Sequence, residues 1–166
     1  CVAYGCTSGT IAAGYSSIYE KVNLAKPNTK VTTPITSAIK ALKKFNINKI
    51  SVFTPYTDEI NHSVAEYFKK ENIEVVSLSY FDISSDLDIG KVDQDYLFEV
   101  LSKIDLSESG ALFVSCTALP VLSIIDNLEK KLGKIVLSSN QTLIWDTLKE
   151  ISYNKNIDGF GQLFKG

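Results

Sequence analysis

The 166-residue sequence predicts an α/β fold built on a parallel sheet. Short apolar segments alternate along the chain with longer amphipathic segments, and strands separated by helices join through right-handed crossovers. Hydrophobic residues make up 45% of the chain and charged residues 22%, which is typical of a chain that buries a core. The predicted strands of the main sheet span residues 50–53, 74–78, 112–115 and 135–137.

Capping and breaking residues delimit the predicted helices. Pro34 lies in the first turn of one helix, and Gly133 ends the helix that Pro120 opens. Residues 138–140 cap a last helix that runs to about residue 151. Residues 81–88 are expected to form a polar loop. The remaining predicted helices span residues 11–24, 58–70 and 92–104.

The apolar segment at residues 2–5 is predicted to belong to a second, similar sheet. The chain contains no methionine and starts directly on this segment, so we expect it to be the C-terminal part of a longer protein. Residues 1–34 are then the remnant of a first α/β half, and residues 35–138 form a second half with four parallel strands. Residues 139–166 form a C-terminal helix and tail that return to the first half.

Composition excludes several classes of function. The formal net charge is −2, so the chain lacks the excess of basic residues that is typical of nucleic-acid-binding proteins. No apolar run approaches the ~20 residues that are needed to cross a bilayer. With His62 as the single histidine, a zinc site is not expected. Glycines are too dispersed for a phosphate-binding motif, so we predict neither metal nor cofactor. Three cysteines in a chain of this size indicate a reducing compartment, so we expect a cytoplasmic protein. A homodimer is compatible with this composition.

Two cysteines share a context. Cys6 and Cys116 each follow an apolar strand and precede a threonine and a predicted helix start, whereas Cys1 is expected only to pack. Ligands of parallel sheets sit outside the carboxyl ends of the strands. A helix N-terminus there favours anions and lowers a thiol pKa. The pair therefore predicts an acid–base or nucleophilic site for a small anion, although a single buried cysteine is more often a packing residue.

Other polar residues fall at the same edge. Tyr56 follows the strand at residues 50–53 and can donate its hydroxyl to a carboxylate, although a loop tyrosine is the commoner case. Asn140 has a sufficient explanation as a helix cap, and His62 is expected on a solvated helix face. Asp86 and Asp88 lie in the 81–88 loop, where solvent exposure is the default.

Taken together, these motifs resemble the maleate cis–trans isomerase and arylmalonate decarboxylase branch of the aspartate/glutamate racemase superfamily. Within that branch, these motifs most resemble those of the ectoine-utilisation racemase-like proteins. The resemblance covers nearly the whole chain. The motifs that carry it are residues 3–10 (AYGCTSGT), 54–56 (TPY), 113–120 (FVSCTALP), 128–129 (LE) and 138–141 (SSNQ), with Trp145.

The resemblance implies two similar α/β halves with the site between them and no cofactor. Cys6 matches the nucleophile that adds to the double bond of maleate and forms a succinyl-type adduct. Cys116 matches the second cysteine, which acts as acid and base. The groups that hold substrate carboxylates are matched by Thr7, Ser8, Tyr56 and Thr117.

Two departures from the family pattern bear on the substrate. The decarboxylase has glycine in place of the first cysteine, so Cys6 disfavours that activity. A family asparagine that binds substrate is replaced here by Asp86, whose charge would repel a dicarboxylate. A second such asparagine would precede this chain.

Three hypotheses follow. The first is a cofactor-independent isomerase of a small carboxylate, with maleate as the single best substrate. The second is an amino-acid-type racemase of the same superfamily. The third is a non-catalytic carboxylate-binding domain in which the cysteines merely pack. Substrate conversion, deuterium uptake at Cα and thiol reactivity distinguish the three.

Overall fold

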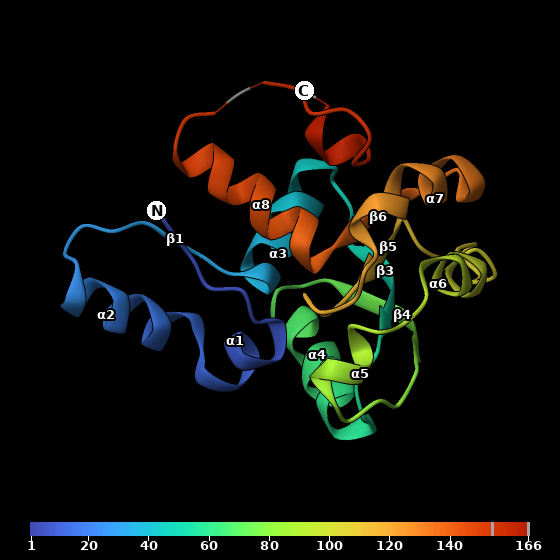
Figure 1. Ribbon diagram of the computed structural model, residues 1–166, viewed down its shortest axis with the longest axis horizontal. Coiled ribbons are helices and arrows are strands. Elements are labelled where there is room, and N and C mark those ends of the chain that lie inside the picture. Colours follow the sequence, from blue (N-terminus) through green and yellow to red (C-terminus); the bar gives the residue numbers. More distant parts are fainter. Residues whose placement is uncertain (154, 166) are drawn as a thin grey trace.

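The computed structural model describes residues 1–153 and 155–165 (Figure 1). Asn154 and Gly166, both in the predicted segment 139–166, lie outside the described residues. The strands are β1 (Val2–Ala3), β2 (Val31–Thr32), β3 (Lys49–Thr54), β4 (Glu74–Tyr80), β5 (Ala111–Val114) and β6 (Ile135–Ser138). The α-helices are α1 (Thr7–Ala13), α2 (Tyr15–Ala25), α3 (Pro34–Lys44), α4 (Asp58–Lys70), α5 (Asp86–Ile89), α6 (Gln94–Leu101), α7 (Ile125–Leu132) and α8 (Ser139–Glu150). Short 3-10 helices span Leu122–Ile124 and Gln162–Phe164.

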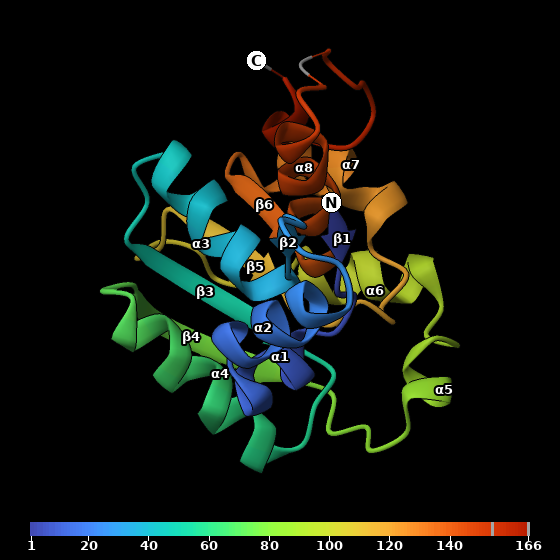
Figure 2. The same ribbon diagram turned by 90° about the vertical axis from the view of Figure 1, so that its left-hand side faces the viewer.

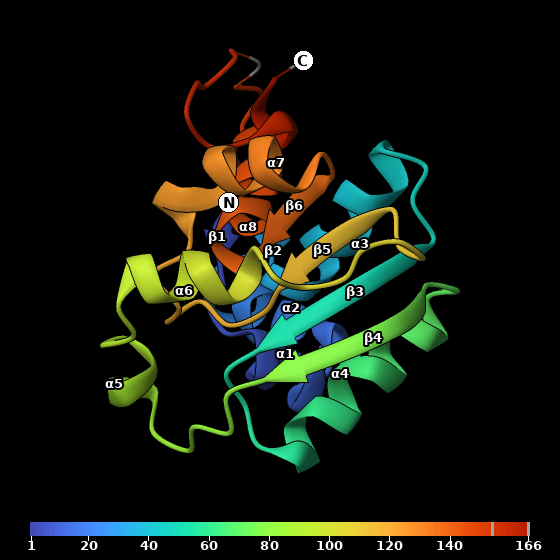
Figure 3. The same cartoon turned by 90° about the vertical axis from the view of Figure 1, so that its right-hand side faces the viewer.

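The main sheet has four parallel strands in the order β4-β3-β5-β6. The α/β fold predicted from the sequence is therefore confirmed. Figures 2 and 3 view the sheet from opposite sides: α3 and α4 cover one face, and α6 and α7 cover the other. The chain leaves β3 in one direction to form β4 and returns to the other side of β3 to form β5, so the order reverses between β3 and β5.

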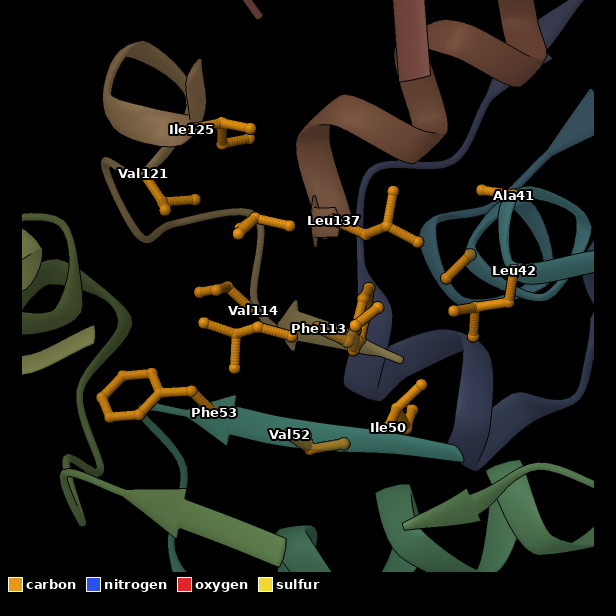
Figure 4. Packing of buried hydrophobic residues seen from close by; sticks show 14 of the residues in the cluster. Ala41, Leu42, Ile50, Val52, Phe53, Phe113, Val114, Val121, Ile125 and Leu137 are labelled. Atoms are coloured by element: carbon orange, nitrogen blue, oxygen red, sulfur yellow. The ribbon is translucent and has the colours of Figure 1, made fainter. Parts of the chain in front are cut away.

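The core fills both faces of this sheet. Side chains of α3, including Ala41 and Leu42, meet one side of β5, and Val121 and Ile125 meet the other (Figure 4). Phe113 of β5 is fully buried. A strand covered on both faces carries apolar residues at successive positions, which explains why β5 reads as a continuous apolar run.

A second, two-stranded parallel sheet joins β1 to β2. Helix α8 contacts both of its strands, and the hydroxyls of Thr32 and Thr147 lie 2.7 Å apart. Helix α8 also packs along α3, where Lys40 Nζ donates to the buried Asp146 carboxylate at 2.8 Å. The C-terminal helix thus connects the two sheets. The division at residues 34 and 138 remains a prediction.

Several local expectations were wrong. The predicted helix at residues 11–24 breaks at Gly14, which has a φ of 78°, and becomes α1 and α2. The expected 81–88 loop contains the short helix α5. Residues 31–32 form a strand that only pairing with β1 defines. Cys1, expected to pack, is exposed.

Candidate active site

The reversal of strand order between β3 and β5 defines the location of the candidate site. Open parallel sheets bind ligands outside the carboxyl ends of strands at such a switch point. Tyr56 follows the end of β3, and Cys116 follows the end of β5. Helix α1, which begins directly after Cys6, lies beside the end to which the β3 arrow points in Figures 2 and 3.

Cys6 lies at the N-cap of α1, as the sequence predicts. Its sulfur accepts a hydrogen bond from the Gly9 N–H at 3.2 Å, and it lies 3.8 Å from the Ser8 hydroxyl. A Cβ at position 9 would come within 2.8 Å of both the Cys6 sulfur and the Tyr4 hydroxyl. Gly9 therefore makes room for the half-buried thiol and for the phenol beside it.

Cys116 occupies a different environment from the one that the sequence predicts. No helix starts after it: a turn intervenes before the 3-10 helix at Leu122, and α7 begins only at Ile125. Cys116 has a φ of 86°, a left-handed conformation that costs a non-glycine residue of order 1–3 kcal/mol. Burial raises the pKa of its thiol, although the Ala118 N–H donates to its sulfur at 3.4 Å. The expected lowering of the thiol pKa is therefore wrong at this position.

Ser139 joins the loops that carry the two cysteines. Its fully buried hydroxyl oxygen accepts a hydrogen bond from the Thr7 hydroxyl at 2.8 Å and another from the Cys116 N–H at 3.1 Å. The sequence alone indicates Ser139 only as part of a helix cap. That cap belongs to Ser138, which forms a capping box with Gln141, so Ser139 is left to bind the two loops.

A second set of bonds strengthens this junction. The Thr117 hydroxyl donates to the Gly5 carbonyl at 2.8 Å, and Asn140 Nδ2 donates to the Thr117 carbonyl at 2.8 Å. Asn140 therefore links α8 to the Cys116 loop by a hydrogen bond and is not the cap residue that the sequence predicts. Residues of α8 and of the loops that follow β1 and β5 meet here, and only the folded chain brings them together.

Tyr56 lies between the two cysteine loops. It is 4% exposed, and its hydroxyl lies beside the side chains of Ser115, Cys116 and Thr7. Burial raises the pKa of this phenol above its ordinary value. The hydroxyl of Ser115 lies near that of Tyr56 but makes no hydrogen bond with any described residue. The alternative interpretation of Tyr56 as a partly exposed loop tyrosine is therefore wrong, and its part in binding substrate stays a prediction. A polar cluster lies around the Cys116 sulfur.

The remaining candidates divide between the site and the surface. Asp86 starts α5 and is exposed, as is the default for this segment, and Asp88 forms an ion pair with Lys91 at 2.8 Å. His62 is exposed on α4, as expected. Among residues 1–153 and 155–165, no group of three or more histidine, cysteine or acidic side chains could hold a metal ion.

Fold and site together define an α/β protein with a two-cysteine candidate active site at the switch point of a parallel sheet. A family model described as arylmalonate decarboxylase matches residues 15–164. The chain belongs to this family, which confirms the resemblance inferred from the motifs. Within the described part of the chain, no helix has both the length and the apolar character that a membrane span requires.

Similar proteins include several maleate isomerases. A maleate isomerase from Alcaligenes faecalis is 27% identical over 175 residues, covering 99% of this chain and 68% of that protein. The maleate isomerase Iso from Pseudomonas putida S16 has a TM-score of 0.92 at 23% identity, covering 99% of this chain and 69% of that one. A Nocardia farcinica maleate cis–trans isomerase mutant with a covalently bound succinylcysteine intermediate has a TM-score of 0.90 at 18% identity, covering 98% and 70%. At such identities the structures show the shared fold.

Proposed function

We propose that this chain is a cofactor-independent isomerase of a small unsaturated carboxylate, of the maleate isomerase type, that uses Cys6 and Cys116. One observation carries the proposal: a single buried hydroxyl, that of Ser139, binds both cysteine loops. A domain in which the cysteines merely pack has no need of such a junction. The maleate isomerases among the relatives support the same activity.

Cys6 is the proposed nucleophile. Of the two site cysteines it is the more exposed, so its sulfur can approach a bound alkene. The first N–H groups of an α-helix have no partner within the helix, and those of Thr7 and Ser8 are the first two in α1. Together with the Ser8 hydroxyl, they can hold a substrate carboxylate close to the attacking sulfur.

Cys116 is the proposed acid and base. Burial raises its pKa, so the thiol is protonated at neutral pH and can supply a proton. Tyr56 lies against this sulfur and can donate to a carboxylate oxygen when substrate is bound. The hydroxyls of Thr7 and Thr117 donate within the protein, so we assign both residues to fixing the loops.

The proposed reaction conserves all atoms. The Cys6 thiolate adds to one alkene carbon, a C–S bond forms, the π bond breaks, and the other carbon takes the proton of Cys116. Rotation about the new C–C single bond exchanges the positions of its substituents. The Cys116 thiolate then removes a proton from the carbon that it protonated, the C–S bond breaks, and the trans alkene leaves with Cys6 again a thiolate.

Conversion of maleate to fumarate, followed by proton NMR, tests this proposal. Cys6→Ser and Cys116→Ser should each lower turnover by roughly 10²–10⁴-fold, because each removes a group that exchanges a bond or a proton with substrate. Cys1→Ser is the matched control, since Cys1 is exposed and outside the site, and it should retain wild-type turnover. Wild-type turnover in either site variant would refute the mechanism.

A further inference from the structure

Two buried side chains hold both backbone polar groups of Tyr56. The Tyr56 N–H donates to the Thr54 hydroxyl oxygen at 3.1 Å, and the Tyr56 carbonyl accepts from Asn61 Nδ2 at 3.2 Å. The Thr54 hydroxyl in turn donates to Asn61 Oδ1. Thr54 is 0% exposed and Asn61 2% exposed, so this ring of hydrogen bonds is shielded from water. We call the side chains of Thr54 and Asn61 the Tyr56 clamp.

The backbone of Tyr56 fixes the direction of every bond in this clamp. A backbone N–H can only donate, so the Thr54 hydroxyl that accepts from it gives its own proton to Asn61. A backbone carbonyl can only accept, so Asn61 must offer it an N–H. Position 61 therefore needs one acceptor and one donor on a short side chain, which an amide supplies and a carboxylate does not. This need accounts for a buried amide on α4, whose other buried residues are Val64 and Phe68.

Neighbouring hydrogen bonds fix the rest of this turn. The Phe81 N–H donates to the Thr54 carbonyl at 3.1 Å, and the Ile83 N–H donates to the Pro55 carbonyl at 2.8 Å. Pro55 has a fixed φ and needs no acceptor, because proline has no N–H. The turn is thus held at each residue, and the clamp sets the direction in which the Tyr56 side chain leaves it.

The pairing of β3 with β5 places this turn beside Cys116. Phe53 and Val114 are partners in the sheet, and the Ser115 N–H donates to the Phe53 carbonyl at 2.8 Å. The two strands lead from this pair to Tyr56 and Cys116, which belong to one buried cluster and are 4% and 5% exposed. A shift of the Tyr56 backbone would therefore change both the position of the phenol and the burial of the thiol.

We propose that Thr54 and Asn61 are positioning residues of the candidate site, which act through the backbone of Tyr56 to hold its phenol over Cys116 and in reach of a substrate carboxylate. The proposal rests on the isomerase function proposed above for its substrate and on the hydrogen bonds of the clamp for its geometry. The polar groups of both side chains bind Tyr56 and each other, so neither is assigned a contact with substrate. Loss of the clamp should therefore resemble loss of the phenol hydroxyl itself.

A pair of substitutions at Thr54 tests this role. Thr54→Val keeps the branched shape of the side chain and removes the hydroxyl, whereas Thr54→Ser keeps the hydroxyl and is the matched control. We expect Thr54→Val to lower kcat/KM for maleate about tenfold, because displacement of a binding group is costly, and Thr54→Ser to stay within about twofold of wild type. Asn61→Asp keeps the size of the side chain and removes the donor, so it should reproduce the loss.

A Tyr56→Phe background separates positioning from a general effect on folding. If the clamp acts through the phenol hydroxyl, Thr54→Val should cost less than about twofold more in this background, because the effects of coupled residues are not additive. The full loss in the Tyr56→Phe background would overturn the inference. Equal losses in Thr54→Val and Thr54→Ser would overturn it as well.

Alkylation of Cys116 tests the clamp without turnover. Peptide mass spectrometry gives the rate at which iodoacetamide modifies each cysteine, and the exposed Cys1 is the internal reference. The ratio of Cys116 to Cys1 modification should rise about tenfold in Thr54→Val and in Asn61→Asp, because a buried thiol reacts when its cover opens. Ser138→Ala removes the cap of α8 without touching the clamp, so it gives the increase that lower stability alone produces.

The two measurements can fail separately. A ratio in Thr54→Val and Asn61→Asp that does not exceed the ratio in Ser138→Ala would overturn the clamp, even if the wild-type protein isomerises maleate. A raised ratio in a protein that does not convert maleate would support the clamp and overturn only the isomerase function.

Discussion

The loops around Cys6 and Cys116 are nearly alike in sequence and unlike in structure. Each has an apolar strand, a small residue, a cysteine and a threonine. The first cysteine caps an α-helix and is half-buried, whereas the second is 5% exposed and has a φ of 86°. The hydroxyl of the first threonine, Thr7, donates to a side chain of α8, and that of the second, Thr117, to a backbone carbonyl near the N-terminus.

This difference matches the two chemical roles that we propose for one short motif. An accessible sulfur suits nucleophilic attack, whereas a buried thiol retains its proton and suits acid catalysis. The surroundings of each loop assign the role, since the two motifs differ little. Changes to these surroundings should therefore alter the two cysteines independently.

Among changes to the surroundings of the cysteines, the largest effect is expected at Gly9, which belongs to the Cys6 loop alone. Gly9→Ala places a methyl group within 2.8 Å of the Cys6 sulfur and should displace it. Misplacement of a reacting atom by about 1 Å can cost roughly 10²-fold in rate. We expect such a loss in kcat for isomerisation, with a thermal midpoint close to that of wild type.

Gly5→Ala is the matched control for this substitution. A Cβ at Gly5 meets nothing within 4 Å, and the backbone carbonyl that accepts from Thr117 is retained. Its kcat should remain close to that of wild type. Equal losses in the two glycine variants would show that the backbone of this loop, and not the space beside the sulfur, limits activity.

A smaller effect is expected at Ser139, which the two loops share. Ser139→Ala leaves the Thr7 hydroxyl and the Cys116 N–H without their acceptor, which costs about 1–3 kcal/mol of unfolding free energy for a buried group. It should also lower kcat about tenfold, because both loops lose their common anchor. Urea unfolding and steady-state kinetics measure the two effects.

Ser138→Ala separates stability from positioning. Ser138 caps α8 and binds neither loop, so its loss should cost about 1 kcal/mol and leave kcat near the wild-type value. If Ser138→Ala and Ser139→Ala reduce kcat to the same extent, the effect of Ser139 is one of helix stability and its positioning role fails.

The smallest effect is a pH dependence of stability that belongs to the Cys116 loop. The folded state raises the pKa of Cys116, so above the unfolded-state value of about 8.5 the folded protein holds a proton that the unfolded chain has lost. The unfolding free energy should therefore be level below about pH 8 and fall as the pH rises through the thiol range.

Cys116→Ser should weaken this fall, because serine does not titrate in that range. Tyr56, whose pKa is also raised by burial, adds a loss of the same sign at higher pH in both proteins. Urea unfolding at several pH values from about 7 to 10 measures the difference. Parallel stability profiles for wild type and Cys116→Ser would show that burial of this thiol does not affect folding.

Much of the fold follows from local pattern. The strands at residues 50–53 and 112–115 are largely apolar. The helix before the first strand starts at Pro34 and the helix after the second ends at Gly133, so the type of these elements is evident from neighbouring residues. Strand β2 and helix α5 were missed for a physical reason. Two residues of β2 become a strand only by pairing with β1, and the four residues of α5 are too few to show a helical period.

The sequence by itself determined the α/β class, the positions of the main strands along the chain and the two cysteines as candidates, because each depends on residue type and short-range spacing. Only the tertiary structure decided that Ser139 binds both loops and that Tyr56 is buried against Cys116. These relations join residues distant along the chain. Burial and long-range hydrogen bonding, which set the pKa of Cys116 and hold the loops together, exist only once the sheets and α8 have packed.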